Sequence, residues 1–297
     1  MILLTGATGL VGSALLPRLT ASGEAVRCLV RDPRRLGTER VRVQIALFDL
    51  ASLGPLRNVM RGVDTVIHLA ASIRDQRDAS LEEVTGIATV RMLRAAEDAG
   101  VRCFVFFSAL GATLHSPSRF LRAKALAEQA VESSSMETLI FAPSIVYAPG
   151  DPWLALLDRL SHLPALPVSG SGRSVYQPIW ADDVARCVSA ALDAASVVKP
   201  SERSRRFELA GPQLHSYNEI AAIALRSFGR ERRLVHVPLP VGRAVLRITE
   251  RIAGSAAFAT WDEAALMEIS MTTPCGAEDA KSLGVSPLGM AEVLRIG

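Results

Sequence analysis

MILLTGATGLVG, residues 1–12, is a short apolar run that passes directly into a glycine-rich turn. Gly6, Gly9 and Gly12 follow at intervals of three, just before a stretch with helical character. In such a motif the first glycine permits a sharp turn, the second lets a pyrophosphate approach the backbone, and the third lets the helix pack against the strand. The helix N-terminus then faces the phosphate charge. We therefore expect a dinucleotide site here; a glycine-rich turn that binds nothing is the alternative.

Short apolar runs alternate with helical stretches through the first two-thirds of the chain. The runs expected to be strands are Met1–Leu4, Ala25–Val30, Val41–Ala46, Thr65–Leu69, Cys103–Ser108 and Thr138–Ala142. The stretches expected to be helices are residues 10–22, 53–60, 82–99 and 118–131. This alternation predicts an α/β fold, a Rossmann-type doubly wound parallel sheet with helices on both faces.

The composition of the sequence changes near residue 150, where Pro, Gly and Ser become frequent. Helical patterns return later, and Ser216 and Glu219 have the spacing of a capping box. We predict a nucleotide-binding Rossmann domain over residues 1–198, with an insertion of subdomain residues at about 150–176. A smaller C-terminal substrate or partner subdomain is predicted over residues 199–297.

The composition excludes several classes of protein. A net charge of +3 without a basic run argues against a nucleic-acid partner. The four cysteines are far apart and form no CxxC pair, so neither a metal site nor a disulfide framework is expected. No apolar run approaches the roughly 20 residues that span a bilayer, and the first residues lack the features of a signal peptide. We therefore expect a cytoplasmic protein without a transmembrane segment.

The second predicted strand ends in VRCLVRDPRR, residues 26–35. An acidic residue at this strand end would bind the adenosine ribose of NAD. Arg31 stands there instead, and Arg34 follows closely. A guanidinium forms charge-assisted, often bidentate hydrogen bonds with a phosphate. We therefore expect NADP as the cofactor, and the adjacent Asp32 keeps NAD as the alternative.

Further motifs resemble the short-chain dehydrogenase/reductase superfamily in its extended or atypical branches. They are FDL at 48–50, VIHLAA at 66–71, FFSALG at 106–111 and APSIVYAPGD at 142–151. Across the chain, the pattern looks most like the group that holds the NAD(P)H-binding accessory subunit of respiratory complex I and its bacterial relatives. The resemblance implies cofactor contacts from the glycine turn, the strand ends and one helix. These residues are Gly6, Thr8, Gly9, Leu10, Val11, Gly12, Arg31, Arg34, Asp49, Leu50, Ala70, Ala71, Ser108, Lys124, Pro143, Ser144 and Ile145.

The helical stretch SRFLRAKALAEQAV, residues 118–131, departs from the superfamily. The family's catalytic pair is Tyr-x-x-x-Lys, and here Phe120 occupies the tyrosine position while Lys124 keeps the lysine. The resemblance implies that the lysine binds the nicotinamide ribose and lowers the pKa of the tyrosine, which moves a proton. Phenylalanine has no proton to give, although Phe120 at this spacing is equally compatible with a core position.

The catalytic candidates are therefore Ser108 and Lys124, with Tyr147 as a substitute proton donor. His115, in the loop before the helix, is a weaker substitute, since a lone histidine in a loop is more often a surface residue. Ser108 could equally be a plain hydroxyl at a strand end.

Three functions are compatible with these residues. The first is an NADP(H)-binding protein with weak or unconventional oxidoreductase activity. The second is a non-catalytic NADP(H)-dependent sensor or assembly factor. The third is an active reductase, epimerase or isomerase that uses another proton donor. The substrate is unidentified, and a protein partner or a homo-oligomer is possible.

A basic amphipathic helix is expected within PVGRAVLRITERIAG, residues 240–254, where Arg243, Arg247 and Arg251 are spaced by four. Such a helix can lie on a membrane or meet a partner. A solvated helix face is the simpler explanation.

Overall fold

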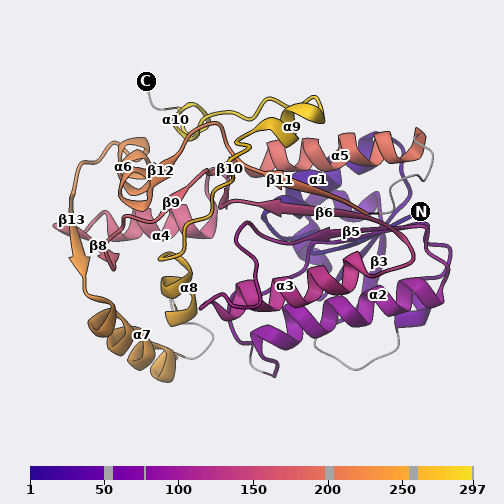
Figure 1. Cartoon of the computed structure of the whole chain (residues 1–297), viewed down its shortest axis with the longest axis horizontal. Helices are drawn as coiled ribbons and strands as arrows, with labels where there is room; N and C mark the ends of the chain where they lie inside the picture. The colour runs from indigo at the N-terminus through magenta and orange to yellow at the C-terminus, as the bar shows by residue number, and fades with distance from the viewer. Residues whose placement is uncertain (50–55, 77, 198–203, 254–259, 296–297) are drawn as a thin grey trace.

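A computed structural model describes residues 1–49, 56–76, 78–197, 204–253 and 260–295, without the side chains of residues 196–197 and 248–253. A central sheet is covered by helices on both faces, and a smaller lobe lies beside it (Figure 1).

The central sheet has the order β11-β6-β5-β4-β1-β2-β3, and all its pairs are parallel. From β1 the strands continue through β2 and β3 on one side and through β4, β5 and β6 on the other. The predicted Rossmann-type, doubly wound sheet is confirmed. The order reverses at β1, so a ligand crevice is expected at the carboxyl ends of β1 and β4. The strands are β1 (Ile2–Thr5), β2 (Val26–Val30), β3 (Gln44–Leu47), β4 (Thr65–His68), β5 (Cys103–Phe107), β6 (Glu137–Pro143) and β11 (Ser204–Leu209).

The two faces of the sheet bury separate cores because neighbouring residues of a strand point to opposite sides. Leu4 of β1 packs in the core that includes α1 and α5, whereas Leu3 packs in the core that includes α2 and α3. These helices are α1 (Leu10–Ala21), α2 (Ala88–Asp98), α3 (Arg119–Glu132) and α5 (Ala181–Val197). The continuous apolar strands are therefore explained by burial on both faces.

Three predicted elements differ from the structure. The strand expected from Val41 begins only at Gln44, because a 3₁₀ helix, η1 (Pro33–Val41), precedes it. Asp32 caps η1 and proline stands at its first position, a combination that starts a helical turn. The helix expected over 53–60 is replaced by a short 3₁₀ helix, η2 (Leu56–Asn58), in the described part of that range. The helix expected from residue 82 starts as a π-helix, η3 (Glu83–Ile87), and continues as α2.

The smaller lobe combines two separate parts of the chain. β8 pairs with β13, and β9 pairs with β12, so residues 150–176 lie with later ones. The predicted capping box of Ser216 and Glu219 starts α6. β11 completes the central sheet although it lies within residues 199–297, so the division at 198 stays a prediction. The remaining elements are β7 (Val146–Tyr147), α4 (Pro152–Leu160), β8 (Ala165–Ser169), β9 (Val175–Tyr176), β10 (Ile179–Trp180), β12 (His215–Ser216), α6 (Tyr217–Ser227), β13 (Arg233–Val237), α7 (Leu239–Ala253), α8 (Trp261–Leu266), α9 (Glu278–Ser282) and α10 (Met290–Val293).

We predict that Gly12→Ala lowers the free energy of unfolding by about 1–3 kcal/mol. A Cβ at Gly12 would lie 2.1 Å from the carbonyl oxygen of Gly6, and backbone cannot move aside as a flexible side chain can. Urea unfolding measures the change. Ser13→Ala, at an exposed position of the same helix, is the control. Equal stability of the two variants would contradict this packing constraint.

Candidate cofactor and active site

The glycine turn between β1 and α1 has no room for side chains. Gly6 has φ of +72°, and a Cβ there would lie 2.8 Å from the backbone nitrogen of Ala70. Gly9 is the N-cap of α1 and has no side chain to satisfy the first N–H groups of the helix. Those groups and the helix dipole form a site that favours an anionic phosphate. The predicted neighbours Thr8, Leu10 and Val11 lie half-buried or at the surface of the same turn.

A chain of hydrogen bonds lies under this turn and defines the state of His68. Thr89 donates to the Thr85 carbonyl at 2.7 Å, so its oxygen accepts from His68 Nε2 at 3.1 Å. His68 Nδ1 then accepts from the Thr5 hydroxyl at 2.8 Å. Burial, with the Lys124 charge nearby, lowers the pKa of His68 to about 3, so the ring is neutral. His68 thereby joins the ends of β1 and β4, where the strand order of the sheet reverses.

The predicted adenosine end lies beyond β2 and β3. Arg31 and Arg34 are exposed immediately after β2, and Asp49 is exposed just after β3. The Asp32 carboxylate accepts from the backbone N–H of Arg34 at 3.0 Å, as the cap of η1. The backbone therefore engages one of the two oxygens of this carboxylate. Leu50, also predicted here, lies outside the described residues.

Lys124 of α3 is buried behind aromatic rings. Its ammonium donates to the carbonyl of Phe107 and lies 5.0 Å from the ring centre of Phe106 and 5.7 Å from that of Phe120. Burial lowers the pKa of Lys124 to about 7, although the charge of Glu128 opposes this shift. The structure thus brings Phe120 and Lys124 together on one face of α3, as their spacing of four predicts.

The hydroxyl of Ser108 is held by a carboxylate one turn further along α3. It donates to Glu128, and the other oxygen of Glu128 accepts from Arg206 Nε at 2.6 Å. Arg206 also forms an ion pair with Glu208 at 2.5 Å. A series of polar contacts therefore connects the end of β5 to β11. A catalytic Ser108 would have to give up this bond. The sequence gives no local signal for this network, because Arg206 is 78 residues from Glu128.

The two candidate substitute proton donors, Tyr147 and His115, differ in burial. Tyr147 is fully buried, and its hydroxyl has no hydrogen-bond partner among the described residues. Burial, reinforced by the charge of Asp183, raises the pKa of Tyr147. A catalytic tyrosine needs the opposite shift. His115 is exposed in the loop after β5.

Residues 143–145, predicted to contact the cofactor, are tied to distant parts of the chain. Ser144 donates to the carbonyl of Met271 at 2.6 Å and accepts from the backbone of Gln177 at 3.1 Å. Pro143 accepts from the backbone N–H of Leu110 at 2.9 Å. Ile145 is half-buried, as is Ala70, and Ala71 is exposed after β4.

Arg119, at the start of α3, binds three carboxylates from three segments. It holds Glu82 through two hydrogen bonds of 2.6 and 2.8 Å, and Asp75 through two of 3.0 and 3.1 Å. It also donates to Asp262 of α8 at 3.0 Å. These bonds raise the pKa of Arg119, led by the one to Glu82, so it stays charged.

A second ion pair completes this Arg119 cluster. Arg74 binds Glu263 of α8 at 2.5 Å. Both acidic residues of α8 are therefore held by the loop after β4 and the first turn of α3, next to Phe120. The cluster therefore ties α8 to the loop after β4 and to the start of α3. No local pattern could have revealed it, because Asp262 is 143 residues from Arg119.

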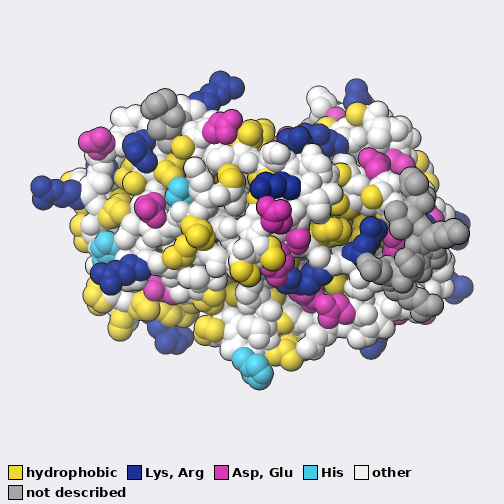
Figure 2. Space-filling view, turned by 45° about the horizontal axis from the view of Figure 1, so that its top comes forward, with side chains coloured by type: hydrophobic (Ala, Val, Ile, Leu, Met, Phe, Trp, Pro, Cys, Tyr) yellow, Lys and Arg dark blue, Asp and Glu magenta, His cyan; other side chains and the backbone are white. Residues whose placement is uncertain are grey.

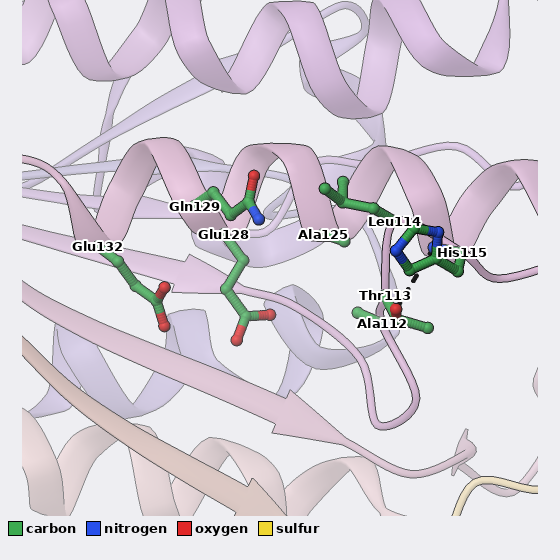
Figure 3. Close-up of a pocket in the computed structure, with 8 residues that line it drawn as sticks. All are labelled: Ala112, Thr113, Leu114, His115, Ala125, Glu128, Gln129 and Glu132. Atoms are coloured by element: carbon green, nitrogen blue, oxygen red, sulfur yellow. Dashed lines mark hydrogen bonds between the residues drawn. The ribbon is translucent and has the colours of Figure 1, made fainter.

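A cavity of about 350 Å³ opens between α3 and the loop after β5 (Figure 3). None of the predicted cofactor residues lines it. Glu128 lines this cavity and also accepts a hydrogen bond from Ser108, so the cavity adjoins the Ser108 network. The cavity is therefore separate from the crevice beyond β1 and β4. Its lining residues are Ala112, Thr113, Leu114, His115, Ala125, Glu128, Gln129 and Glu132.

Among the described residues, no group of three or more His, Cys, Asp or Glu side chains could hold a metal ion. Within the same ranges, every helix is too short or too polar to cross a bilayer.

A family model described as NAD(P)H-binding matches residues 6–194. This range includes the glycine turn, both strand ends of the predicted crevice, and Lys124.

Curated proteins with the same pattern fall into different functional groups. The chain is 31% identical over 251 residues to the NADH dehydrogenase [ubiquinone] 1 alpha subcomplex subunit 9, mitochondrial, of Arabidopsis thaliana, covering 81% of this chain and 61% of the relative. The mouse subunit of the same name is 27% identical over 98% of this chain and 78% of its own length. Ceramide reductase of Caulobacter vibrioides is 28% identical over 81% and 74%.

Solved structures share the fold over nearly the whole chain. A nucleoside-diphosphate-sugar epimerase from Staphylococcus aureus has a TM-score of 0.78 with 20% identity, covering 99% of both chains. The UDP-glucose 4-epimerase of Thermus thermophilus, in complex with NAD, has a TM-score of 0.73 with 17% identity, covering 99% of this chain and 96% of its own. At this identity the likeness shows the fold alone.

We predict that the stability cost of burying Lys124 shrinks as pH rises above 7. Its pKa falls from 10.5 unfolded to about 7 folded, so between these values the unfolded state binds more protons. Stability then rises with pH, by up to about 1.4 kcal/mol per pH unit. Lys124→Met lacks this titration, so its unfolding free energy relative to wild type should fall across that range.

Urea unfolding at a series of pH values measures this difference. Lys281→Met, at an exposed position of α9, is the control and should run parallel to wild type. Parallel profiles for wild type and Lys124→Met would show that Lys124 stays charged when folded.

Proposed function

This chain belongs to the NAD(P)H-binding family, and we propose that it binds NADP(H) but lacks the usual proton donor of its superfamily. The resemblance to the short-chain dehydrogenase/reductase superfamily is confirmed, and an NAD(P)H-binding, oxidoreductase-like protein is the coarse function. The chain spans only 61% of the Arabidopsis relative, so a whole-protein activity is itself part of the proposal.

The choice of NADP over NAD rests on the end of β2. A carboxylate there would bind the ribose hydroxyls of NAD, but Asp32 is turned to the backbone of Arg34. Arg31 and Arg34 are exposed beside it, where a 2′-phosphate would approach. Charge-assisted hydrogen bonds from a guanidinium favour that phosphate.

The proposal of weak activity is carried by one observation: the ring of Phe120 lies 5.7 Å from the ammonium of Lys124. Phenylalanine occupies the place from which a tyrosine would exchange a proton under the influence of that charge. Bound NADPH would supply a hydride, but this chain would offer no acid at the carbonyl oxygen. Loss of a general acid typically costs about 10²–10⁴-fold in rate.

Lys124 keeps a role without the tyrosine, since its ammonium can bind ribose hydroxyls. To do so it would exchange the carbonyl of Phe107 for the ribose, or share its protons between them. Burial lowers the pKa of Lys124. Hydrogen bonds from its ammonium to the oxygen atoms of a ligand would oppose this shift and favour the charged form. The glycine turn would hold the pyrophosphate.

A non-catalytic sensor or assembly factor is the second candidate. Phe120 favours it, and relatives named as NADH dehydrogenase subunits favour a protein partner. An active reductase, epimerase or isomerase with another donor is the third, and the named ceramide reductase keeps it open. The substrate is unidentified, and the cytoplasmic location stays a prediction.

We predict tighter binding of NADP(H) than of NAD(H), measured by calorimetric titration with both cofactors. Arg31→Asp should narrow or reverse the preference, since it removes a partner of the 2′-phosphate worth about 1.5–3 kcal/mol and adds repulsion. Arg94→Asp, at an exposed position of α2, controls for the charge change alone. Equal affinities of wild type for the two cofactors would refute the role of Arg31.

We predict little NADPH oxidation with simple aldehydes and ketones. Phe120→Tyr should raise it by about 10²–10⁴-fold where the pocket admits a carbonyl, because it restores a hydroxyl beside Lys124. Phe228→Tyr, at the end of α6, is the control. Absence of a gain, with NADPH binding intact, would favour the non-catalytic candidate.

Robust wild-type turnover would overturn the proposal if Tyr147→Phe or His115→Ala abolished it. Either loss would identify another residue as the proton donor.

A further inference from the structure

The segment RRLVHVPLPVGRAVLR, residues 232–247, combines β13 with the first part of α7. It contains four arginines and many apolar residues, but no aspartate or glutamate. We call this segment the β13–α7 surface. Arg119 and Arg206, by contrast, are matched by carboxylates.

The helix α7 is apolar on the side that meets the body and again on its outer side. Leu246 is buried, and Gly242 comes close to Ser169 of β8. Val241 and Val245, one turn apart, are 53% and 51% exposed. The outer face of a surface helix is ordinarily polar, so an apolar stripe there indicates a binding surface.

The preceding strand adds another exposed apolar residue and an arginine. Val235 of β13 is 51% exposed, and Arg233 points to the same side of this strand because side chains alternate. Arg243 and Arg247 are exposed on α7, and Arg243 lies over the ring of Trp261 at 5.3 Å. α7 lies at the edge of the molecule (Figure 1), and Figure 2 shows apolar and basic side chains gathered over that part of the lobe.

Charge complementarity identifies the occupant. A stripe of valines flanked by arginines, without an acidic residue, matches a lipid surface whose headgroups carry phosphate and whose interior is apolar. Guanidinium groups bind phosphate through paired hydrogen bonds. We propose that the β13–α7 surface binds an anionic phospholipid membrane, with the valines in the headgroup layer and the arginines on lipid phosphates.

This attachment is peripheral and independent of the cofactor. The Arg119 cluster and Lys124 lie on other elements, so loss of membrane binding leaves NADPH binding intact. Failure of the proposed cofactor preference would likewise leave this surface unaffected.

Sedimentation of the full chain with phosphatidylcholine vesicles, with and without phosphatidylglycerol, tests the proposal. Wild type should bind the anionic vesicles and much less the neutral ones, and added salt should weaken the binding. Arg233→Gln and Arg247→Gln should each lower partitioning by about fivefold, since each removes one charge near the surface. Val241→Gln with Val245→Gln should lower it while leaving the charge unchanged.

Matched controls are Arg226→Gln in α6 and Leu126→Gln in α3, both at exposed positions outside the surface. They should bind vesicles like wild type. Circular dichroism and NADPH binding confirm that each variant is folded. Absence of wild-type binding to anionic vesicles would overturn the proposal, as would equal losses in the controls. Self-association through the same valines, without vesicle binding, would assign the surface to a second copy instead.

Discussion

The close approach of backbone to backbone at the glycine turn is the constraint on which the nucleotide site depends. A Cβ at Gly6 would meet the backbone nitrogen of Ala70, and one at Gly12 would meet the carbonyl of Gly6. These contacts bring β1, β4 and the start of α1 together without intervening side chains. The helix can then present its free N–H groups at the sheet's reversal point, where an anionic ligand binds. The neutral His68, at the end of β4, forms hydrogen bonds with Thr5 of β1 and with Thr89 of α2, so it links the two strands to each other and to that helix.

Around Lys124, burial and charge oppose one another. The aromatic rings of Phe106 and Phe120 exclude water, which disfavours the ammonium, while the carbonyl of Phe107 and the ring faces partly offset that cost. Such a site is suited to a ligand that brings its own oxygen atoms. A tyrosine in place of Phe120 would use the same charge for proton transfer. The phenylalanine instead leaves the lysine as a binding group, which is why cofactor retention and weak chemistry fit together.

The two lobes are joined at this site by polar contacts and not by a shared apolar interface alone. Arg119 holds Asp262, and Ser144 donates to Met271, so the segment that carries α8 crosses from the first turn of α3 to the end of β6. The lobe's outer helix, α7, contacts the same segment through Arg243 and Trp261, whereas its exposed valines, Val241 and Val245, form a separate surface.

The sequence by itself determined the sheet, the glycine turn and the pairing of Phe120 with Lys124, because each depends on local rules: apolar runs form buried strands, only glycine fits the turn, and residues four apart share a helix face. The tertiary structure alone decided that Ser108 is bound by Glu128 and that β11 completes the sheet. It also decided the Arg119 cluster. Charged partners more than a hundred residues apart leave no periodic trace, since their meeting depends on how the lobes dock and which carboxylates burial brings within reach.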